Sequence, residues 1–297
     1  MGASEEASGT AHAHPPPAPP CVQGGGTVSA ALTAAARRLA PQSATARLDA
    51  ELLMAHALGV SREDLLLRRL DSAVPDAFTA LVGRRRAGEP VAYITGRRAF
   101  WTIELEVGPG VLIPRPDSET LVEAAVEHFR GRAPERILDL GTGPGTLLLA
   151  ALDQWPKALG LGVDASEAAL SYARRNAERL GLAGRAELRL GDWTAGLEGP
   201  FDLILCNPPY IEAGEPLMRD VAEWEPHEAL FAGEDGLDAY RRLAPAIPPL
   251  LAPGGLACLE VGAFQASAVA ALFEARGLAV SRRTDLSGHV RCLALTA

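Results

Sequence analysis

The tetrapeptide Asn207-Pro208-Pro209-Tyr210 follows an apolar run, Phe201–Cys206, that has the pattern of a buried strand. The Asn207 side-chain oxygen and the Pro208 carbonyl are two acceptors that can hold the two N–H groups of a planar amide or amine. The prolines stiffen the backbone that presents these acceptors, and Tyr210 can pack on a flat group and exclude water. A proline-stiffened turn would also explain the residues, but their chemistry favours a site that orients a weakly nucleophilic nitrogen.

A second pattern, upstream of the tetrapeptide, is typical of a ligand loop. The strand-like run 137–140 enters a glycine-rich turn made of Gly141, Thr142, Gly143, Pro144 and Gly145. Glycines let the backbone come within contact distance of a ligand that a β-carbon would obstruct. The spacing differs from the dinucleotide pattern GxGxxG, because Thr146 stands where the third glycine would fall.

Polar residues also end the next two predicted strands. The carboxylate of Asp164 can accept hydrogen bonds from both hydroxyls of a ribose, and Asp192 and Trp193 can face the edge and the plane of an adenine. Asp139, within the first strand, is expected to support the glycine turn rather than to touch the ligand. Together with the tetrapeptide, these residues indicate methyl transfer from S-adenosylmethionine to a planar nitrogen.

The elements that must position these residues alternate from residue 117 to residue 297. Short apolar strands are separated by helices, one of them at 146–153 directly behind the glycine turn. The predicted strands are 136–140, 161–164, 186–190, 201–206, 256–261 and two more near Leu278 and Val290. Such alternation predicts an α/β fold with a largely parallel sheet covered by helices on both faces, and ligands bind beyond the carboxyl ends of its strands.

The N-terminal part has a different pattern. Residues 1–26 are rich in proline and glycine and predict a disordered tail. Residues 27–88 predict a small helical bundle, with apolar positions 28, 32, 35 and 39 on one helix and 48, 52, 55 and 58 on the next. Gly59 is expected to end the second helix, and Ser61 to begin the third. The triplet Arg84-Arg85-Arg86 could touch an RNA or ribosomal partner, but a solvated helix end is favoured.

Residues 89–116 are expected to link the two parts. Val91, Tyr93 and Ile94 are β-type, and so are the near-alternating residues Phe100, Trp101, Ile103, Leu105 and Val107, which predicts a β-hairpin.

Composition excludes several classes of protein. The formal net charge of the 297 residues is −9, so an acidic catalytic part would repel phosphates and nucleic acid is not expected as a substrate. There is no apolar run of about 18 residues and no secretory signal pattern, which predicts a cytoplasmic protein without a membrane segment. The histidines form no HExxH motif, so no metal is expected. The four cysteines show no paired spacing, so no disulfide framework is expected; the cysteines are Cys21, Cys206, Cys258 and Cys292.

With these motifs in place, the sequence resembles the bacterial release-factor glutamine methyltransferases, nearly continuously from residue 44 to residue 297. The resemblance rests on the glycine turn, the tetrapeptide and several more restrictive runs. These are Asp49-Ala50-Glu51-Leu52-Leu53, Pro90–Gly96, Phe100-Trp101, Ile113-Pro114-Arg115-Pro116-Asp117-Ser118-Glu119-Thr120, and the stretch from Glu225-Pro226 through Asp235-Gly236-Leu237.

The resemblance implies a seven-stranded Rossmann-like methyltransferase sheet, with an N-terminal helical domain that helps to dock a protein substrate. It implies methylation of the glutamine side-chain amide in the Gly-Gly-Gln loop of peptide-chain release factors. On the family pattern, Asn207, Pro208, Pro209 and Tyr210 bind the glutamine and Phe100 lines the pocket. Residues 141–145, Asp164, Trp193 and Asn207 hold the cofactor. Pro144 and Thr146 depart from the family, which usually has serine and a smaller residue there.

Three alternatives remain open. A sister family methylates a glutamine of a ribosomal protein with the same tetrapeptide, although the run from Ile113 to Glu119 looks like the release-factor branch. DNA adenine methyltransferases also use Asn-Pro-Pro-Tyr, but they would want a basic cleft and a target-recognition domain. An idle S-adenosylmethionine-binding module is the third, and the intact tetrapeptide argues against it.

Overall fold

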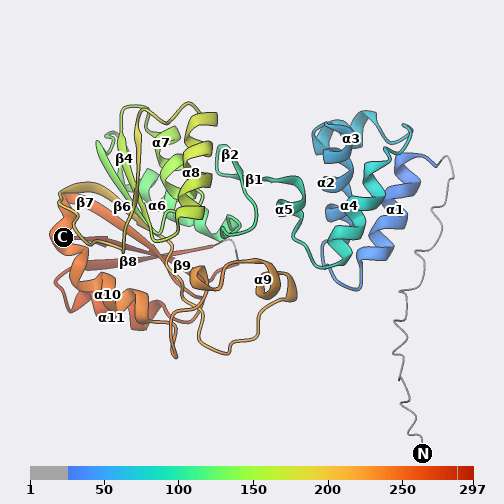
Figure 1. The fold of residues 1–297 in the computed structure, drawn as a ribbon. Coiled ribbons are helices and arrows are strands. Elements are labelled where there is room, and N and C mark those ends of the chain that lie inside the picture. The colour runs from blue at the N-terminus through green and yellow to red at the C-terminus, as the bar shows by residue number, and fades with distance from the viewer. Residues whose placement is uncertain (1–25, 286) are drawn as a thin grey trace, which may run out of the picture.

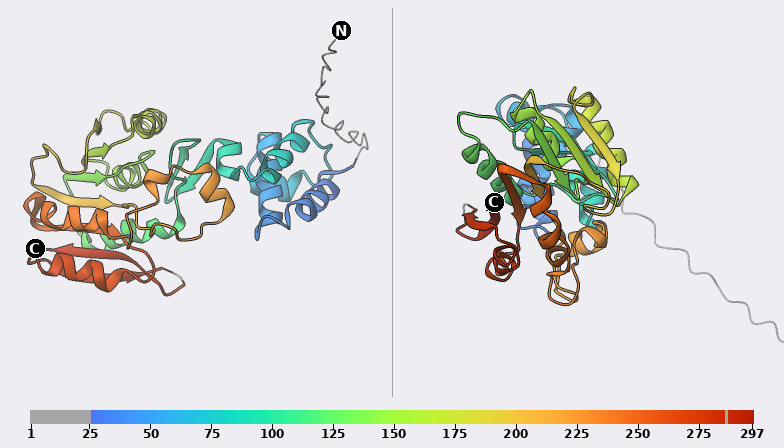
Figure 2. Two further views of the ribbon diagram at one scale, coloured as in Figure 1. Left: turned by 60° about the horizontal axis from the view of Figure 1, so that its bottom comes forward. Right: turned by 90° about the vertical axis from the view of Figure 1, so that its left-hand side faces the viewer.

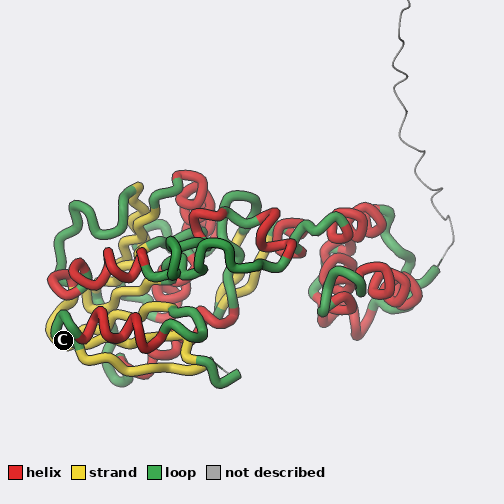
Figure 3. The backbone as a smooth tube through the Cα atoms, turned by 90° about the horizontal axis from the view of Figure 1, so that it is seen from below, coloured by secondary structure: helices red, strands yellow, loops and turns green. Residues whose placement is uncertain are grey.

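The computed structural model describes residues 26–285 and 287–297, which form a helical bundle and a larger part built on a seven-stranded sheet (Figure 1). Figure 3 shows the bundle at one end of the molecule, joined to the sheet part through a linker. The predicted disordered tail and Cys21 lie outside the described residues, apart from Gly26. No helix in the described part of the chain is long and apolar enough to cross a membrane.

The N-terminal bundle is built from four helices, α1 Val28–Leu39, α2 Ala46–Leu58, α3 Arg62–Arg68 and α4 Ala77–Arg86. The predicted apolar face of α1 is confirmed, because all four of its positions are buried. Gly59, with a φ of 65°, ends α2, and the Ser61 hydroxyl accepts a hydrogen bond from the amide of Asp64 at the start of α3. Both turn predictions are therefore confirmed.

The predicted apolar face of α2 is confirmed at Ala55, which is buried, but is wrong at Leu48. Leu48 is 39% exposed, whereas Ala46, Ala50 and Leu53 are buried against the neighbouring helices. The apolar residues of α2 are spread around the helix, so their spacing in the sequence could not identify the buried face.

The arginine triplet at the end of α4 is not simply a solvated helix end. The guanidinium of Arg85 is buried and lies 2.8 Å from a carboxylate oxygen of Asp49 and 3.4 Å from one of Asp220. Asp220 belongs to α9 (Arg219–Trp224), in the sheet part of the chain. The residue therefore links the bundle to that part, while Arg84 pairs with Glu89.

The linker begins with a helix rather than with the predicted strand. Residues Val91–Thr95 form α5, which starts after Pro90 and ends at Gly96, where φ is 73°. Three of its five residues, including Tyr93, are buried, and the Tyr93 hydroxyl donates to the Val111 carbonyl at 2.5 Å. Packing on both sides thus overrides the β propensity of these residues. The predicted hairpin follows, with β1 Arg97–Phe100 antiparallel to β2 Ile103–Glu106.

The sheet has the strand order β5-β4-β3-β6-β7-β9-β8. The five strands from β5 to β7 are parallel, and β9 runs antiparallel to both of its neighbours. This confirms the α/β prediction of a mostly parallel sheet. The bounds are β3 Arg136–Leu140, β4 Leu159–Asp164, β5 Ala186–Leu190, β6 Phe201–Cys206, β7 Leu251–Glu260, β8 Ala279–Thr284 and β9 Val290–Thr296.

Helices cover both faces of this sheet (Figures 1 and 2). On one face, α6, α7 and α8 pack against side chains such as Ile137 and Leu203, and on the other, α10 and α11 pack against Leu138 and Ile204. Alternate residues of β3 and β6 therefore enter different cores, as the strand period of two requires. The bounds are α6 Glu119–His128, α7 Thr146–Gln154, α8 Glu167–Arg179, α10 Asp238–Ala246 and α11 Ala266–Glu274, with short 3-10 turns η1 Pro116–Ser118, η2 His227–Ala229 and η3 Pro248–Leu250.

Candidate active site

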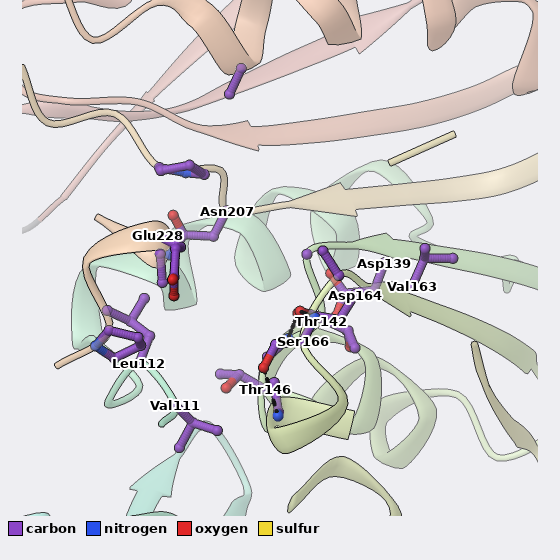
Figure 4. A pocket seen from close by; sticks show the side chains of 18 of the residues that line it. Val111, Leu112, Asp139, Thr142, Thr146, Val163, Asp164, Ser166, Asn207 and Glu228 are labelled. Carbon is purple, nitrogen blue, oxygen red and sulfur yellow. Dashed lines mark hydrogen bonds between the residues drawn. The ribbon is translucent and has the colours of Figure 1, made fainter. Parts of the chain in front are cut away.

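A cavity of about 830 Å³ lies at the carboxyl ends of β3, β4, β5 and β6. Most of the predicted site residues line it: Gly141, Thr142, Gly143, Pro144, Asp164, Asp192, Trp193, Asn207 and Pro209. Figure 4 shows Asn207 and Glu228 on one side of the cavity and Thr142, Asp164 and Ser166 on the other. Parallel strands that end together thus bring the glycine turn and the tetrapeptide to one site, although they are far apart in sequence.

The glycine turn lies close to other parts of the chain. At Gly141, where φ is 72°, an added β-carbon would lie 3.6 Å from the Trp193 ring. At Gly145, which caps the N-terminus of α7 with a φ of 88°, a β-carbon would lie only 2.7 Å from the Leu149 side chain. Gly145 is not among the cavity-lining residues, so glycine is favoured there by the positive φ and by the close approach of Leu149 rather than by a ligand.

Asp164 holds the turn from the end of β4. One of its carboxylate oxygens accepts the amide of Gly143 at 2.8 Å, and the other accepts the amide of Ser166 at 2.8 Å. Each carboxylate oxygen has a second lone pair, so these bonds leave capacity for further donors on the cavity side.

Asp139 lies below the turn, as its position in the strand predicted. One carboxylate oxygen accepts the Thr142 hydroxyl at 2.7 Å and the Leu148 amide at 3.1 Å. Its other oxygen is buried and has no hydrogen-bond partner among the described residues. Burial raises the pKa of Asp139 to about 7.

The residues after β5 contribute differently from each other. Trp193, with an unusual φ of 52°, presents its ring to Gly141. The carboxylate of Asp192 lies 2.6 Å from the guanidinium of Arg242 on α10, and both side chains are exposed. Arg242 also lines the cavity, and no pattern in the sequence indicated this pair.

Asn207 begins the tetrapeptide at the end of β6. Its side-chain nitrogen donates to the Ser118 hydroxyl at 3.1 Å. Its side-chain oxygen accepts no hydrogen bond from any described residue, and the residue lines the cavity. The side chain of Pro208 is buried, and neither it nor Tyr210 is among the lining residues.

Tyr210 is anchored at two points. Its hydroxyl donates to a carboxylate oxygen of Glu260 at 3.3 Å, and its carbonyl accepts the side-chain nitrogen of Gln265 at 2.8 Å. Burial raises the pKa of Tyr210, so the phenol stays protonated.

Phe100 does not line the cavity, contrary to the prediction. It is 1% exposed and packs in the core with Ile103 and Leu105. It ends β1, and the amide of the next residue, Trp101, donates to Glu119 at 2.9 Å. The turn of the hairpin is thereby held against α6, with the Phe100 ring inward.

Sequence reasoning missed Glu260, the last residue of β7. It is 1% exposed, and burial raises its pKa to about 7. The Ser118 hydroxyl donates to one carboxylate oxygen and Tyr210 to the other. An acidic residue at the end of an apolar strand was the available signal, the same one that identified Asp164.

A second missed group, the pair of Glu225 and Arg115, lies beside the cavity. Glu225, 4% exposed, accepts the Ile113 amide at 2.9 Å, and its carboxylate lies 2.5 Å from the guanidinium of Arg115, which lines the cavity. The chain after α9 is therefore tied to the run that follows the hairpin.

Comparison with known proteins gives two family matches, to the PrmC N-terminal domain over residues 30–96 and to a methyltransferase domain over residues 132–253. Among solved structures, the chain resembles a methyltransferase from Pyrococcus furiosus, with a TM-score of 0.50 and 20% identity over 73% of this chain and 96% of that one. It also resembles a Thermus thermophilus 16S rRNA methyltransferase in complex with AdoMet and guanosine, with a TM-score of 0.50 and 22% identity over 68% and 50% of the two chains. These likenesses show the fold.

The relatives by sequence are more informative. A release factor glutamine methyltransferase from Rhodospirillum rubrum is 47% identical over 83% of this chain and 78% of that protein. Proteins of the same name from Bradyrhizobium diazoefficiens and Cereibacter sphaeroides are 44% and 46% identical, over 89% and 88% of this chain and 93% and 95% of their own lengths. The chain therefore belongs to the release factor glutamine methyltransferase family.

Proposed function

We propose that the chain transfers a methyl group from S-adenosylmethionine to the side-chain amide nitrogen of the glutamine in the Gly-Gly-Gln loop of peptide-chain release factors. The observation that carries the proposal is the state of Asn207. Its nitrogen is engaged by Ser118, so its oxygen is the free acceptor in a cavity that also contains the glycine turn. The names and high identity of the relatives support the same reaction.

The cavity fits the cofactor. Gly141 and Gly143 line the cavity without β-carbons, Asp164 has free lone pairs for a ribose, and Trp193 offers an aromatic face. The unpartnered oxygen of Asp139 suits a cationic or hydrogen-bonding group. S-adenosylmethionine, when bound, would supply a methyl group on a positively charged sulfur. The new bond forms between the glutamine nitrogen and the methyl carbon, and the sulfur keeps the electron pair of the carbon–sulfur bond that breaks.

The chain's own contribution is to orient the amide. We assign the two N–H groups of the glutamine to the Asn207 side-chain oxygen and the Pro208 carbonyl. These hydrogen bonds fix the plane of the amide and strengthen as positive charge develops on the nitrogen. The nitrogen gives up one proton to water after it has gained the methyl group. Tyr210, which is held by Glu260 and Gln265, is proposed to pack beside the glutamine amide.

We place the partner and the location accordingly. The substrate is a release factor, a protein, and the net charge of −9 disfavours a nucleic acid in its place. The bundle of residues 27–88 is proposed to dock the release factor, and residues 89–116 to connect it to the catalytic part, residues 117–297. Because release factors act in translation, we propose a cytoplasmic location.

The experiment is a methyl-transfer assay with labelled S-adenosylmethionine and three separate acceptors: a release factor, ribosomal protein and DNA. Label is expected in the release factor alone. Stronger labelling of ribosomal protein or of DNA would overturn the proposal, and so would a complete lack of transfer by protein that binds the cofactor.

A further inference from the structure

Glu260 is connected to the tetrapeptide through Ser118. The residues come from three segments that are distant in sequence: Ser118 from η1, Asn207 from the end of β6, and Glu260 from the end of β7. Asn207 donates to the Ser118 hydroxyl, which in turn donates to Glu260. Ser118 is 2% exposed and Glu260 is 1% exposed, so the bond between these two residues is shielded from water.

We propose that Glu260 is a positioning residue, which fixes the orientation of the Asn207 amide through Ser118 so that the Asn207 oxygen faces the substrate. The proposal rests on the function proposed above. It adds a group that does not touch the substrate but determines which end of the Asn207 side chain does.

The single proton of the Ser118 hydroxyl determines how the Asn207 amide is oriented. When Glu260 is ionised, its carboxylate can only accept hydrogen bonds, so the Ser118 proton must point to it. The Ser118 oxygen then has only lone pairs left for Asn207, and it selects the NH₂ end of that amide. The other end, the oxygen, is thereby presented to the cavity, where the glutamine needs an acceptor.

Protonation of Glu260 removes this constraint. The carboxylic acid can donate its own proton to Ser118, which frees the Ser118 proton to bond the Asn207 oxygen. The amide could then turn over and present NH₂ to the NH₂ of the glutamine, donor against donor. Orientation is therefore expected to depend on the charge of Glu260.

The surroundings of Glu260 place its protonation within the physiological pH range. Burial raises its pKa to about 7, and the negative charge of Asp117 acts in the same direction. The hydroxyls of Ser118 and Tyr210 and the positive charge of Arg291 oppose the rise. Three further groups near Glu260 stay protonated, because burial raises the pKa of Cys206 and Tyr240, and the Cys258 thiol and burial raise that of Cys292.

The second carboxylate oxygen extends the same control to Tyr210, whose hydroxyl it accepts at 3.3 Å. One buried carboxylate thus holds the first and the last residue of the tetrapeptide. A purely structural carboxylate would stabilise the fold without affecting the pH dependence of methyl transfer.

The test uses the full chain, a release factor and single-turnover rates on both sides of about pH 7. Glu260→Met removes both acceptors and keeps the length of the side chain, and Ser118→Ala removes one hydroxyl. Each is expected to slow transfer about tenfold to a hundredfold, because a positioned polar contact is loosened rather than deleted. The double variant should be no slower than the slower single variant, since both break one connection.

Glu260→Gln supplies the pH readout, because its side chain cannot ionise. The unmodified chain should gain rate as the pH rises through about 7, whereas Glu260→Gln should keep a reduced rate that does not change through this range. Tyr240→Phe is the matched control: its hydroxyl donates to the Glu260 backbone carbonyl at 2.8 Å, not to the carboxylate. It should retain the rate and the pH profile of the unmodified chain.

A readout without cofactor or substrate is the side-chain NH₂ signal of Asn207 in the NMR spectrum, identified by its loss in Asn207→Ala. It should shift as the pH passes through about 7 in the unmodified chain, but not in Glu260→Gln. Additive losses of rate in the double variant would overturn the proposal. A pH transition that persists in Glu260→Gln would also overturn it, because the transition would then belong to another group, such as Asp139. An unmodified chain that does not methylate release factor would instead refute the function itself.

Discussion

Replacing Asn207 with alanine separates the orientation of the substrate from the binding of the cofactor. The change removes the side-chain oxygen proposed to accept one glutamine N–H, and it also removes the hydrogen bond to Ser118. The glycine turn keeps its own support, because Asp164 still accepts the Gly143 amide at 2.8 Å. The glutamine can therefore enter, but one of its two fixed contacts is missing.

The expected loss of rate follows from the removal of one of these two contacts. Loss of one preorganised contact to the reacting group costs about a hundredfold to a thousandfold in rate, or about 3–4 kcal/mol of transition-state stabilisation. The affinity for the cofactor should fall by less than about tenfold, because most of the contacts between the cofactor and its rigid site remain.

The assay is single-turnover methylation of a release factor by Asn207→Ala, beside a calorimetric titration with S-adenosylmethionine. Leu159→Ala is the control, because that exposed side chain lies at the amino end of β4, whereas the cavity lies at the carboxyl end. A rate within a few-fold of the unmodified chain would refute the reasoning, and so would a loss of cofactor binding that matches the loss of rate.

Three other predictions concern the cofactor, the tail and the buried acids. Asp164→Ala should weaken S-adenosylmethionine binding by about 2–3 kcal/mol through loss of charge-assisted bonds to the ribose; an unchanged calorimetric dissociation constant would place the ribose elsewhere. Removal of residues 1–26 should leave the melting temperature and the rate nearly unchanged, because the segment has few apolar side chains to dock, and a large loss would reveal a role for it. Folding raises the pKa of Asp139 and of Glu260 to about 7, so the folded chain keeps protons that the unfolded chain releases near pH 4, and the free energy of unfolding should fall as the pH rises from there to about 7. Urea denaturation should show a smaller fall in Glu260→Gln, and an equal fall would mean that Glu260 titrates near its ordinary pKa.

Patterns that depend on one segment at a time were predictable from the sequence. Strands β3, β5 and β6 have the predicted bounds, because short apolar runs between turn residues have few other solutions. The glycine turn and the tetrapeptide were identified because their chemistry is carried by consecutive residues. Residues of both line one cavity, as the carboxyl ends of parallel strands require.

Features set by packing between distant segments were not predictable in the same way. Val91–Thr95 has β-type residues but is helical, since its side chains are buried between the bundle and the sheet part. Phe100 faces a core rather than the cavity, because the direction of the hairpin decides where its ring points. Glu260 could be noted as an acid at a strand end, but its connection to Asn207 passes through Ser118, 142 residues away from it in sequence. Only the fold brings the three together.

The most direct measurement of the proposed reaction is to locate the methyl group by tandem mass spectrometry of a release factor that has been incubated with the chain and S-adenosylmethionine. The fragment ions should place one methyl group on the side-chain nitrogen of the glutamine in the Gly-Gly-Gln loop. A release factor with asparagine in place of that glutamine should remain unmethylated. A methyl group on any other residue, or undiminished transfer to the asparagine variant, would contradict the assignment of this site to glutamine.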